Sequence, residues 1–537
     1  MKNMRFLVVA GLTMLTVSAC ADLTVVNQNA PDRERALSTP GDVESLISGA
    51  YRTWWFSQHG WAPGPALSVG ADQHTSSWGN FMMKDFSHEP RLPINNSPSY
   101  GYSYVIESPY FGAYSALAAV RDGLLAINEG LQIGENGADT PRAKAFAKFI
   151  QGLSLGTVAL LYDKAFILDE NADIENATFS PYDQVMAAAI SSLEEAVSIA
   201  GSNSFSTPDA WMSGAHTSDE LVRLMHSYIA RFMAEVPRTQ AERDAVDWNA
   251  VLNHISQGVT QDFTVFGDDV NWWDILKTYT EYRGWGRVDV RTVGPADQSG
   301  AFQNWMATPV DQRNEFLIDT DDHRITNGDP ESMGLYFGYA GHSAFKPERG
   351  TYHFSMYGSY RYDDYNTDWV GDMPELTVAE MDFLKAEALY RTGNKQGAVD
   401  IINTYRTTNG QLPPATLNGA QGQDRCVPRM ADGSCGDLWE TLKYEKRMEV
   451  WHTFPGDAFF DDRGWGDLVT GTAIEFPIPG KELLTLLMDI YTFGGSGEGA
   501  APAEIIHPTF TPESIAARVR TFRKIADSNG KAAPVFR

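Results

Sequence analysis

Amphipathic helical segments, many of them in pairs, are the strongest structural signal in this chain of 537 residues. Apolar residues recur three and four positions apart, and cap residues mark several segment ends. Thr217-x-x-Glu220 and Thr377-x-x-Glu380 have the spacing of capping boxes, and Gly393 stands where a C-terminal cap belongs. The pattern predicts a mostly α-helical protein. The expected helices cover residues 39–54, 113–131, 141–162, 181–197, 217–232, 248–257, 378–391, 395–406 and 436–451.

The paired helices resemble the hairpins of tetratricopeptide repeats, although their irregular spacing does not fit an array with a period of about 34 residues. Two long stretches without helical periodicity interrupt them, at residues 56–109 and 262–372, and both are rich in Trp, Tyr and Gly. Such stretches in a compact protein are usually functional. Within the second stretch, residues 352–357 alternate in polarity, which predicts a short strand.

Composition excludes several classes of function. The chain has 69 acidic and 42 basic residues, a formal charge of −27, which disfavours binding to nucleic acid and electrostatic docking on anionic lipid. Hydrophobic residues make up 43% of the chain and charged residues 21%, so a large core is expected and wholesale disorder is not. We found no GxSxG, Walker or HExxH motif and no metal-ligand spacing among the histidines, so we predict no catalytic residue, metal or cofactor.

The N-terminus has the pattern of an export signal. Lys2 and Arg5 precede an apolar run over residues 6–17, which is too short to span a membrane comfortably. The ending Val17-Ser18-Ala19-Cys20 resembles the bacterial lipobox, which implies cleavage before Cys20 and lipidation of its sulfur. We therefore predict a lipoprotein signal peptide over residues 1–19. A plain secretory signal with an incidental cysteine is the alternative.

The other two cysteines, Cys426 and Cys435, lie close together in a loop rich in Pro, Gly and Asp. An exported chain meets an oxidising compartment, which favours a disulfide between them over two free thiols. A zinc site is disfavoured because no His or second Cys pair lies nearby.

Four ordered segments resemble the SusD/RagB family of outer-membrane nutrient-binding lipoproteins. They are Cys20 with the following stretch to Pro31 and the helix ending Gly49-Ala50-Tyr51; the stretch Ala386–Gly393 with Ala398 and Ile402-Asn403-Thr404-Tyr405-Arg406; the stretch Tyr444–Glu449 with Phe460–Gly466; and Phe476-Pro477-Ile478-Pro479. The order and spacing of the segments fit the family along nearly the full chain. Glu445-x-Arg447 and Phe454-Pro455-Gly456-Asp457 depart from the family pattern and indicate a divergent branch.

The resemblance implies a single SusD-like domain over residues 20–537, built from four tetratricopeptide-like helix pairs. It implies that loops opposite this scaffold bind an oligomeric nutrient, commonly a glycan, without catalysis. The implied partner is a TonB-dependent outer-membrane transporter, and the implied location is the outer membrane, lipid-anchored and facing the cell surface. A peptide ligand and a helical-repeat scaffold that binds no nutrient are alternatives.

The expected ligand site combines aromatic rings, which pack on the apolar faces of sugars, with polar groups for their hydroxyls. Small neighbours such as Ser77 and Gly79 leave a ring of Trp78 accessible, whereas each ring taken singly could equally belong to a small core. The candidate ligand-binding residues are Asp72, Trp78, Asn80, Trp272, Trp273, Tyr282, Trp285 and Trp305.

Two further patterns have alternative interpretations. Carboxyl pairs such as Asp72 with Asp274, or Asp461 with Asp462, are the groups that glycoside hydrolysis requires. We favour structural ion pairs for the second pair, together with Glu445 and Arg447. The acidic run over residues 319–324 could hold calcium but lacks the glycine and closing glutamate of an EF-hand loop, so a structural role is favoured.

Overall fold

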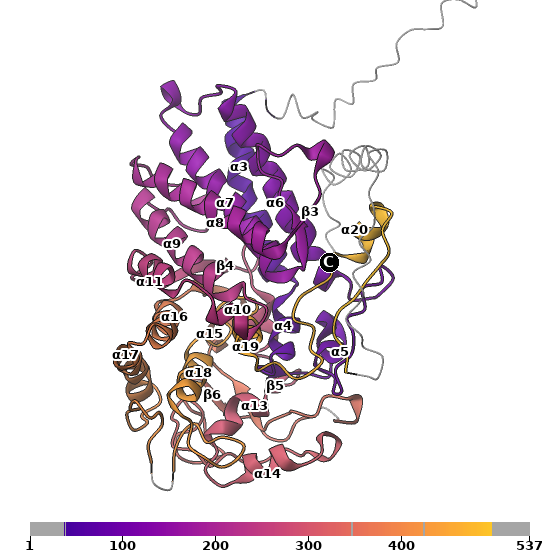
Figure 1. The fold of residues 1–537 in the computed structure, drawn as a ribbon, viewed down its shortest axis with the longest axis vertical. Helices are drawn as coiled ribbons and strands as arrows, with labels where there is room; N and C mark the ends of the chain where they lie inside the picture. The colour runs from indigo at the N-terminus through magenta and orange to yellow at the C-terminus, as the bar shows by residue number, and fades with distance from the viewer. Residues whose placement is uncertain (1–36, 38, 345–346, 423–424, 497–537) are drawn as a thin grey trace, which may run out of the picture.

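The computed structural model describes residues 37, 39–344, 347–422 and 425–496. The predicted signal peptide and the lipidation site Cys20 lie outside the described residues. Helix pairs descend along one side of the molecule, and short elements occupy the other side and the lower end (Figure 1). The main helices are α3 (Pro40–Trp55), α6 (Tyr104–Asn128), α7 (Thr140–Leu161), α8 (Tyr182–Gly201), α9 (Ser218–Glu235), α11 (Trp248–Ser256), α16 (Val378–Arg391), α17 (Lys395–Thr408) and α18 (Leu438–Glu449).

These helices pack as antiparallel neighbours in the order in which they occur. α3 packs on α6, α6 on α7, α7 on α8, α8 on α9, α9 on α11, and α16 on α17. α7 is the centre of the upper layer, because all its residues from 145 to 161 are buried. The mostly helical fold is thus confirmed. Among the described residues no helix is both long and apolar enough to cross a membrane.

Local sequence explains where the helices begin. The Thr39 side chain accepts a hydrogen bond from Asp42 N at the start of α3, with Pro40 in the first turn. Thr217 and Glu220 form the expected capping box at α9. Thr377 also caps α16, but the carboxylate of Glu380 binds Arg231 instead, at 2.6 Å from Nε. The second capping box is therefore only half formed.

Short elements fill the two stretches where no helix was expected. They are a π-helix over Phe56–Gly60 and the helices α4 (Gly64–Gly70), α5 (Met83–Ser87), α12 (Ile275–Tyr279), α13 (Val290–Val293), α14 (Ala301–Ala307) and α15 (Asp363–Asp368). Further short helices are α10 (Gln240–Asp244), α19 (Asp457–Trp465) and α20 (Gly480–Thr485). Periodicity could not predict them, because residues such as those of α4 are buried on every side.

Four two-stranded antiparallel ribbons connect segments between the helices. They pair β1 (His74–Thr75) with β5 (Arg287–Val288), β2 (Lys164–Phe166) with β3 (Phe179–Pro181), β4 (Phe263–Asp268) with β8 (Val370–Leu376), and β6 (Phe337–Tyr339) with β7 (Tyr357–Ser359). The β1–β5 ribbon joins the two long stretches, in the register His74 opposite Val288. The predicted strand over 352–357 was wrong, since only Tyr357 belongs to one.

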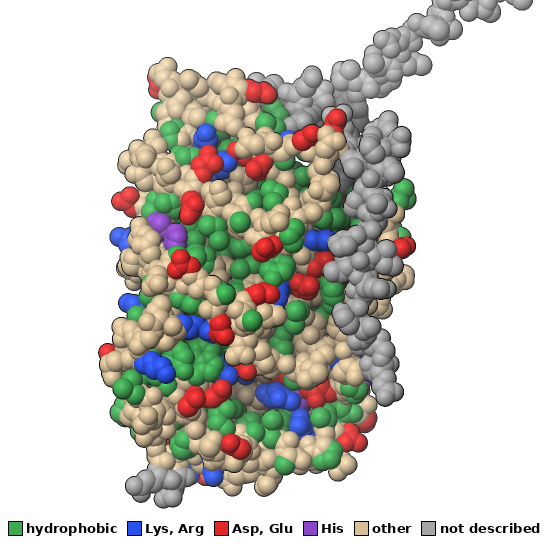
Figure 2. Space-filling model, viewed as in Figure 1, with side chains coloured by type: hydrophobic (Ala, Val, Ile, Leu, Met, Phe, Trp, Pro, Cys, Tyr) green, Lys and Arg blue, Asp and Glu red, His purple; other side chains and the backbone are tan. Residues whose placement is uncertain are grey.

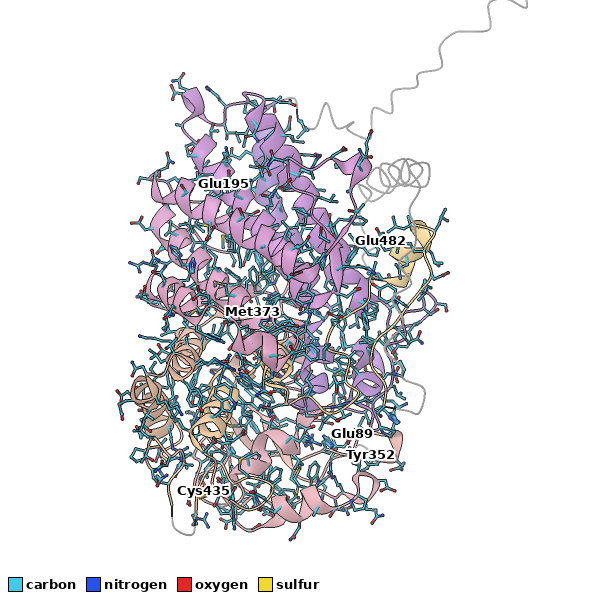
Figure 3. The ribbon with its side chains drawn as sticks, viewed as in Figure 1. Glu89, Glu195, Tyr352, Met373, Cys435 and Glu482 are labelled. Carbon is cyan, nitrogen blue, oxygen red and sulfur yellow. A yellow bond between two sulfur atoms is a disulfide. The ribbon has the colours of Figure 1, made fainter. Side chains whose placement is uncertain are left out.

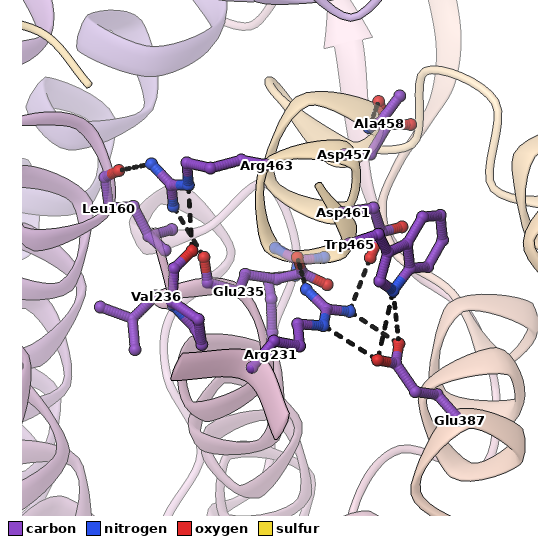
Figure 4. Close-up of polar contacts among 12 residues, drawn as sticks. Leu160, Arg231, Glu235, Val236, Glu387, Asp457, Ala458, Asp461, Arg463 and Trp465 are labelled. Atoms are coloured by element: carbon purple, nitrogen blue, oxygen red, sulfur yellow. Dashed lines mark hydrogen bonds and ion pairs between the residues drawn. The ribbon is translucent and has the colours of Figure 1, made fainter. Parts of the chain in front are cut away.

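Buried ion pairs connect the helical layers. Arg243 of α10 contacts Glu235 at 3.0 Å, Glu387 at 2.7 Å and Asp461 at 2.8 Å, all deep in the interior. Lys446 of α18 joins the same group through Asp461 at 2.6 Å. Figure 4 shows the hydrogen bonds around Glu387 in this network. These contacts support a structural role for Asp461.

The other predicted ion pairs are also structural. Arg447 pairs with Asp462, as expected, whereas Glu445 binds Arg324 and Arg406 rather than Arg447. The guanidinium of Arg425 spans Asp319 and Asp321, at 2.9 and 2.8 Å, and Arg324 holds Asp322. The acidic run over 319–324 is therefore already neutralised by arginines.

Cys426 and Cys435 form the predicted disulfide, with an S–S distance of 2.06 Å. The bridge closes a loop that returns to the start of α18, and Figure 3 shows Cys435 at the lower end of the molecule. Arg429 inside the loop pairs with Cys435 through a backbone bridge. The loop is consequently held at both ends.

Candidate functional site

A continuous group of aromatic side chains links the two long stretches, and we call it the ring surface. Four of its rings are exposed: Trp61 (55%), Trp78 (42%), Tyr282 (38%) and Trp285 (41%). Solvent-exposed tryptophans in a cluster are unusual, because burying such a ring is strongly favourable. The other members, which support these rings, are Phe81, Trp273, Tyr279 and Trp369.

Ring contacts connect seven of the eight members. Trp285 packs on Tyr282 and on Tyr279, with centroids 4.8 Å apart in both pairs. Tyr279 meets the edge of Phe81 at 4.7 Å, and Phe81 stacks with Trp61 at 6.3 Å. Three of the exposed rings, those of Trp61, Tyr282 and Trp285, therefore share one aromatic base.

Trp61 extends the group in a second direction. It meets Trp273 edge to face at 4.6 Å, and Trp273 stacks with Trp369 at 6.0 Å. Trp369 has a left-handed backbone (φ 62°) at the end of α15, next to β8. The group thus draws on four segments of the chain, at residue 61, residues 78–81, residues 273–285 and residue 369.

The Trp78 loop is fixed against Trp285 by hydrogen bonds. The hydroxyl of Ser76 donates to the carbonyl of Trp285 at 2.7 Å and accepts from the Trp78 amide at 3.3 Å. A side chain at Gly79 would meet the hydroxyl of Tyr102 at 2.9 Å, so a glycine is required there. Phe81 adopts a left-handed backbone (φ 55°), which is strained for an aromatic residue and frequent at binding sites.

Asn80 supplies a polar group at this surface. Its amide donates to the hydroxyl of Tyr279 at 2.5 Å, while its carbonyl oxygen has no hydrogen-bond partner among the described residues. The oxygen itself is buried, so a ligand hydroxyl could reach this acceptor only if the Asn80 side chain turned outward.

The turn that carries Tyr282 and Trp285 depends on the buried carboxyl of Glu281. Its Oε1 accepts from the Ser359 hydroxyl at 2.7 Å, which ties the turn to β7. Burial raises the pKa of Glu281 to about 7. Arg283 in the same turn pairs with Asp363 at 2.6 Å.

Five of the eight predicted ligand-binding residues belong to this surface or its edge: Trp78, Asn80, Trp273, Tyr282 and Trp285. Their ligand contacts stay a prediction. Sequence analysis missed Trp61 and Trp369. Trp61 stands within Gly60-Trp61-Ala62-Pro63-Gly64, whose small neighbours are the same signal that singled out Trp78.

Asp72, Trp272 and Trp305 are buried and lie outside the ring surface. Trp272 packs in the main core against Tyr51 and Trp55, at 5.9 and 6.0 Å. Trp305 of α14, which is 3% exposed, packs in a small core with Phe302. Asp72 is held by Arg91 at 2.7 Å.

Asp72 also belongs to the one group of potential metal ligands among the described residues, with Glu89 and His353. Figure 3 places Glu89 beside Tyr352, the neighbour of His353. Burial opposes the charged form of His353, but the carboxylates of Asp289 and Asp72 outweigh it and raise its pKa well above the usual value. A protonated imidazole has no lone pair for a metal, so this group is an ion-pair cluster.

Comparison with solved structures identifies the fold. A SusD superfamily protein from Bacteroides vulgatus aligns with a TM-score of 0.52 and 14% identity, over 83% of this chain and 97% of that one. A SusD superfamily protein from Bacteroides thetaiotaomicron gives 0.50 and 13%, over 83% and 96%. A SusD-like protein from Bacteroides fragilis gives 0.50 and 14%, over 80% and 87%.

No protein-family model matches the sequence, and no curated protein is similar to it. At identities this low the likeness shows the fold alone, and it confirms the SusD-like fold that the ordered sequence segments predicted.

Proposed function

We propose that this protein, which has the fold of SusD superfamily proteins, is an outer-membrane lipoprotein that binds an oligomeric glycan and delivers it to a TonB-dependent transporter. The observation that carries the proposal is the ring surface, with three exposed aromatic rings on one supported base and the exposed ring of Trp78 on a loop that is hydrogen-bonded to Trp285. The rest of the proposal follows from the sequence resemblance and the export signal.

The ring surface suits a sugar chain better than a small compact ligand. Sugar rings present flat C–H faces that pack on exposed aromatic faces, and a row of rings can hold successive units. Arg283 and Asp363, with side chains 30% and 42% exposed, lie at the Tyr282 turn and offer polar groups for hydroxyls. The rings are held in place before binding, so little conformational entropy is lost when the ligand arrives.

Binding without hydrolysis is the activity that we propose. A glycosidase needs two carboxyl groups that face the substrate, one of them protonated. Asp274 caps α12 and contacts His59 and Lys277 at 2.8 Å each, in the interior. Asp461 and Asp462 are buried in ion pairs with Lys446 and Arg447. None of these carboxyls belongs to the ring surface.

The decisive experiment is calorimetry of the protein without its first 20 residues against a panel of oligosaccharides. With the ligand that binds, Trp78→Ala and Trp285→Ala should each cost about 2 kcal/mol of binding free energy, as for aromatic hot spots. Phe266→Ala is the matched control, because Phe266 is an exposed ring on β4 outside the ring surface. Its affinity should equal that of the wild type.

Two results would overturn the proposal. One is an oligosaccharide whose affinity is unchanged in both tryptophan variants, which would place the site elsewhere. The other is binding of oligopeptides in place of every sugar tested, which would favour the peptide alternative.

Lipidation and the partner are tested separately. Cys20→Ala should release the protein from the membrane fraction, and mass spectrometry of the wild type should find an acylated N-terminal cysteine. Co-purification from detergent-solubilised membranes should recover a TonB-dependent transporter. A wild-type protein with an unmodified N-terminus would refute the lipoprotein assignment.

A further inference from the structure

A cavity of about 320 Å³ is lined by charged and apolar side chains and shares no residue with the ring surface. Its size is at the lower end of the range for small-molecule sites. Figure 2 shows a hollow with blue and red side chains in the lower part of this face, where Figure 1 places α13 and α18. The wall comes from the end of α4, α13, α14, the disulfide loop, α18 and the region of α19.

One end of the cavity carries positive charge that the protein does not fully neutralise. Arg429 donates to the carbonyls of Gly433 and Gln298, at 3.2 and 3.3 Å, and makes no ion pair with a described carboxylate. Arg291 lies 3.5 Å from Asp72, whose other oxygen is already held by Arg91. Arg429 therefore has no carboxylate partner among the described residues, and Arg291 shares Asp72 with Arg91, which favours an incoming anion.

On the α18 side of the cavity, negative charge exceeds positive charge. The ammonium of Lys443 contacts both Glu440 and Asp467 at 2.8 Å, so two carboxylates share one cation. The neighbouring pair of Arg447 and Asp462 is balanced. Glu440 and Asp467 are partly exposed, with 31% and 35% of the side chain accessible, so both can reach a cationic ligand group.

Part of the cavity wall is apolar. Phe302 and Met306 of α14, Met430 of the disulfide loop and Pro295 line it. An aliphatic side chain would bury its surface here, with methionines adapting to its shape.

We propose that this cavity binds a small zwitterion with an apolar side chain, either a single α-amino acid or a dipeptide. Its carboxylate would pair with Arg429 and Arg291, its ammonium with Glu440 and Asp467, and its side chain would pack on Phe302, Met306 and Met430. This ligand differs in chemistry from an oligosaccharide, and the inference does not rest on the glycan proposal.

The test is calorimetry with leucine and with Leu-Leu, which separates the two sources of the zwitterion. 4-Methylpentanoate lacks the ammonium and 3-methylbutylamine lacks the carboxylate, and both should bind at least about tenfold more weakly, since one charged hydrogen bond is worth at least about 1.5 kcal/mol. Equal binding of all four compounds would contradict the charge assignment.

Substitutions of residues that line the cavity test whether the zwitterion binds there. Arg429→Gln should weaken binding of the zwitterion about tenfold, because a charge-assisted pair is lost. Arg425→Gln is the matched control: the same change in the same loop, at an exposed arginine that pairs with Asp319 and Asp321 outside the cavity. Glu440→Gln tests the other end, and Trp78→Ala should leave zwitterion affinity unchanged.

The proposal fails if neither leucine nor Leu-Leu releases heat at millimolar concentration, or if Arg429→Gln and Arg425→Gln bind equally well. Melting curves of both variants show whether a loss of binding reflects a loss of folding. As a second measure, replacing Cys426 and Cys435 by Ser should weaken binding while leaving the oligosaccharide affinity intact, because the disulfide holds only the loop of Arg429 and Met430.

Discussion

At the scale of single residues, the exposure of each side chain distinguishes core tryptophans from surface tryptophans, a distinction that the sequence alone could not make. Trp272 and Trp273 are adjacent in a segment without periodicity, so no pattern tells which ring faces the core. In the structure, the ring of Trp272 packs against Tyr51 in the core, whereas the ring of Trp273 contacts Trp61 in the ring surface. Trp78 and Trp285 were predictable because small residues flank them, whereas the burial of Trp305 depends on Phe302 and Arg313 beside it.

This division predicts two opposite mutational outcomes. Trp272→Ala should lower the free energy of unfolding by about 3–5 kcal/mol, since it leaves a cavity in the main core. Trp285→Ala should change it by less than about 1 kcal/mol, because an exposed ring contributes little to folding. Urea denaturation of both variants gives the comparison, and a similar loss in the two would show that Trp285 is a core residue.

Glu281 predicts a pH dependence of stability. Its pKa is about 7 in the folded protein and near the usual 4.5 in the unfolded chain. Between these values the folded state binds more protons, so the free energy of unfolding falls as the pH rises from 4.5 to 7. Glu281→Gln removes the charge and keeps the acceptor for Ser359, so the variant should gain stability above pH 7, by up to about 3 kcal/mol.

The measurement is thermal melting of Glu281→Gln and wild type from pH 4.5 to 8. The difference between them should vanish at the acid end. Glu331→Gln, at an exposed glutamate, is the control and should show no trend. A constant difference across the range would mean that Glu281 is ionised in the folded protein throughout.

At the scale of elements, the sequence predicted those helices whose ends are marked by local cap residues. α16 was predicted with its observed bounds and α17 within two residues, because Thr377, Asn394 and Gly393 mark their ends. α6 begins at Tyr104, well before the predicted residue 113, and contains Pro109, a residue type that ordinarily ends or kinks a helix. The short helices of the long stretches carry no local signal, since tertiary contacts on all sides stabilise them.

The two capping sites give a matched test of local and long-range roles. Glu220 and Glu380 hold the same third position of their helices, but Glu220 is exposed and Glu380 binds buried Arg231. Glu220→Ala should cost about 1 kcal/mol, the worth of a cap. Glu380→Ala should cost about 3 kcal/mol, because buried Arg231 loses one of its two carboxylates and keeps only Glu375, at 3.0 Å. Denaturation midpoints measure both, and equal losses would contradict the assignment.

At the scale of the whole molecule, the network around Arg243 joins the upper helix pairs to the lower ones. It connects α9, α10, α16, α18 and α19 through Glu235, Glu387, Asp461 and Lys446. Arg243→Met should lower the free energy of unfolding by about 3–5 kcal/mol, since three carboxylates lose their main cation. Adding Glu387→Gln should recover part of the loss by removing one charge, and calorimetric melting of the single and double variants tests this. If the second substitution deepens the loss, electrostatic repulsion is not its cause.

The overall architecture was predictable from ordered sequence segments, whereas the position of the ligand surface was only partly so. Helix pairs follow from periodicity along the chain. The ring surface and the cavity beside α13 and α18 are each assembled from segments hundreds of residues apart. No local sequence pattern indicates which of these segments come into contact.

The last described segment runs back along the first long stretch. Ile94 N bonds to Phe493 O, Ser496 N to Arg91 O, and the side chain of Asn96 contacts the carbonyls of Ile478 and Tyr491. During folding, contacts that close so large a loop are expected to form late. Closing the loop costs conformational entropy, and contacts formed earlier between nearer segments shorten the loop that remains to be closed. During synthesis the segment around Arg91 is made long before residues 478–496, so it lacks these partners until that far segment has also been made.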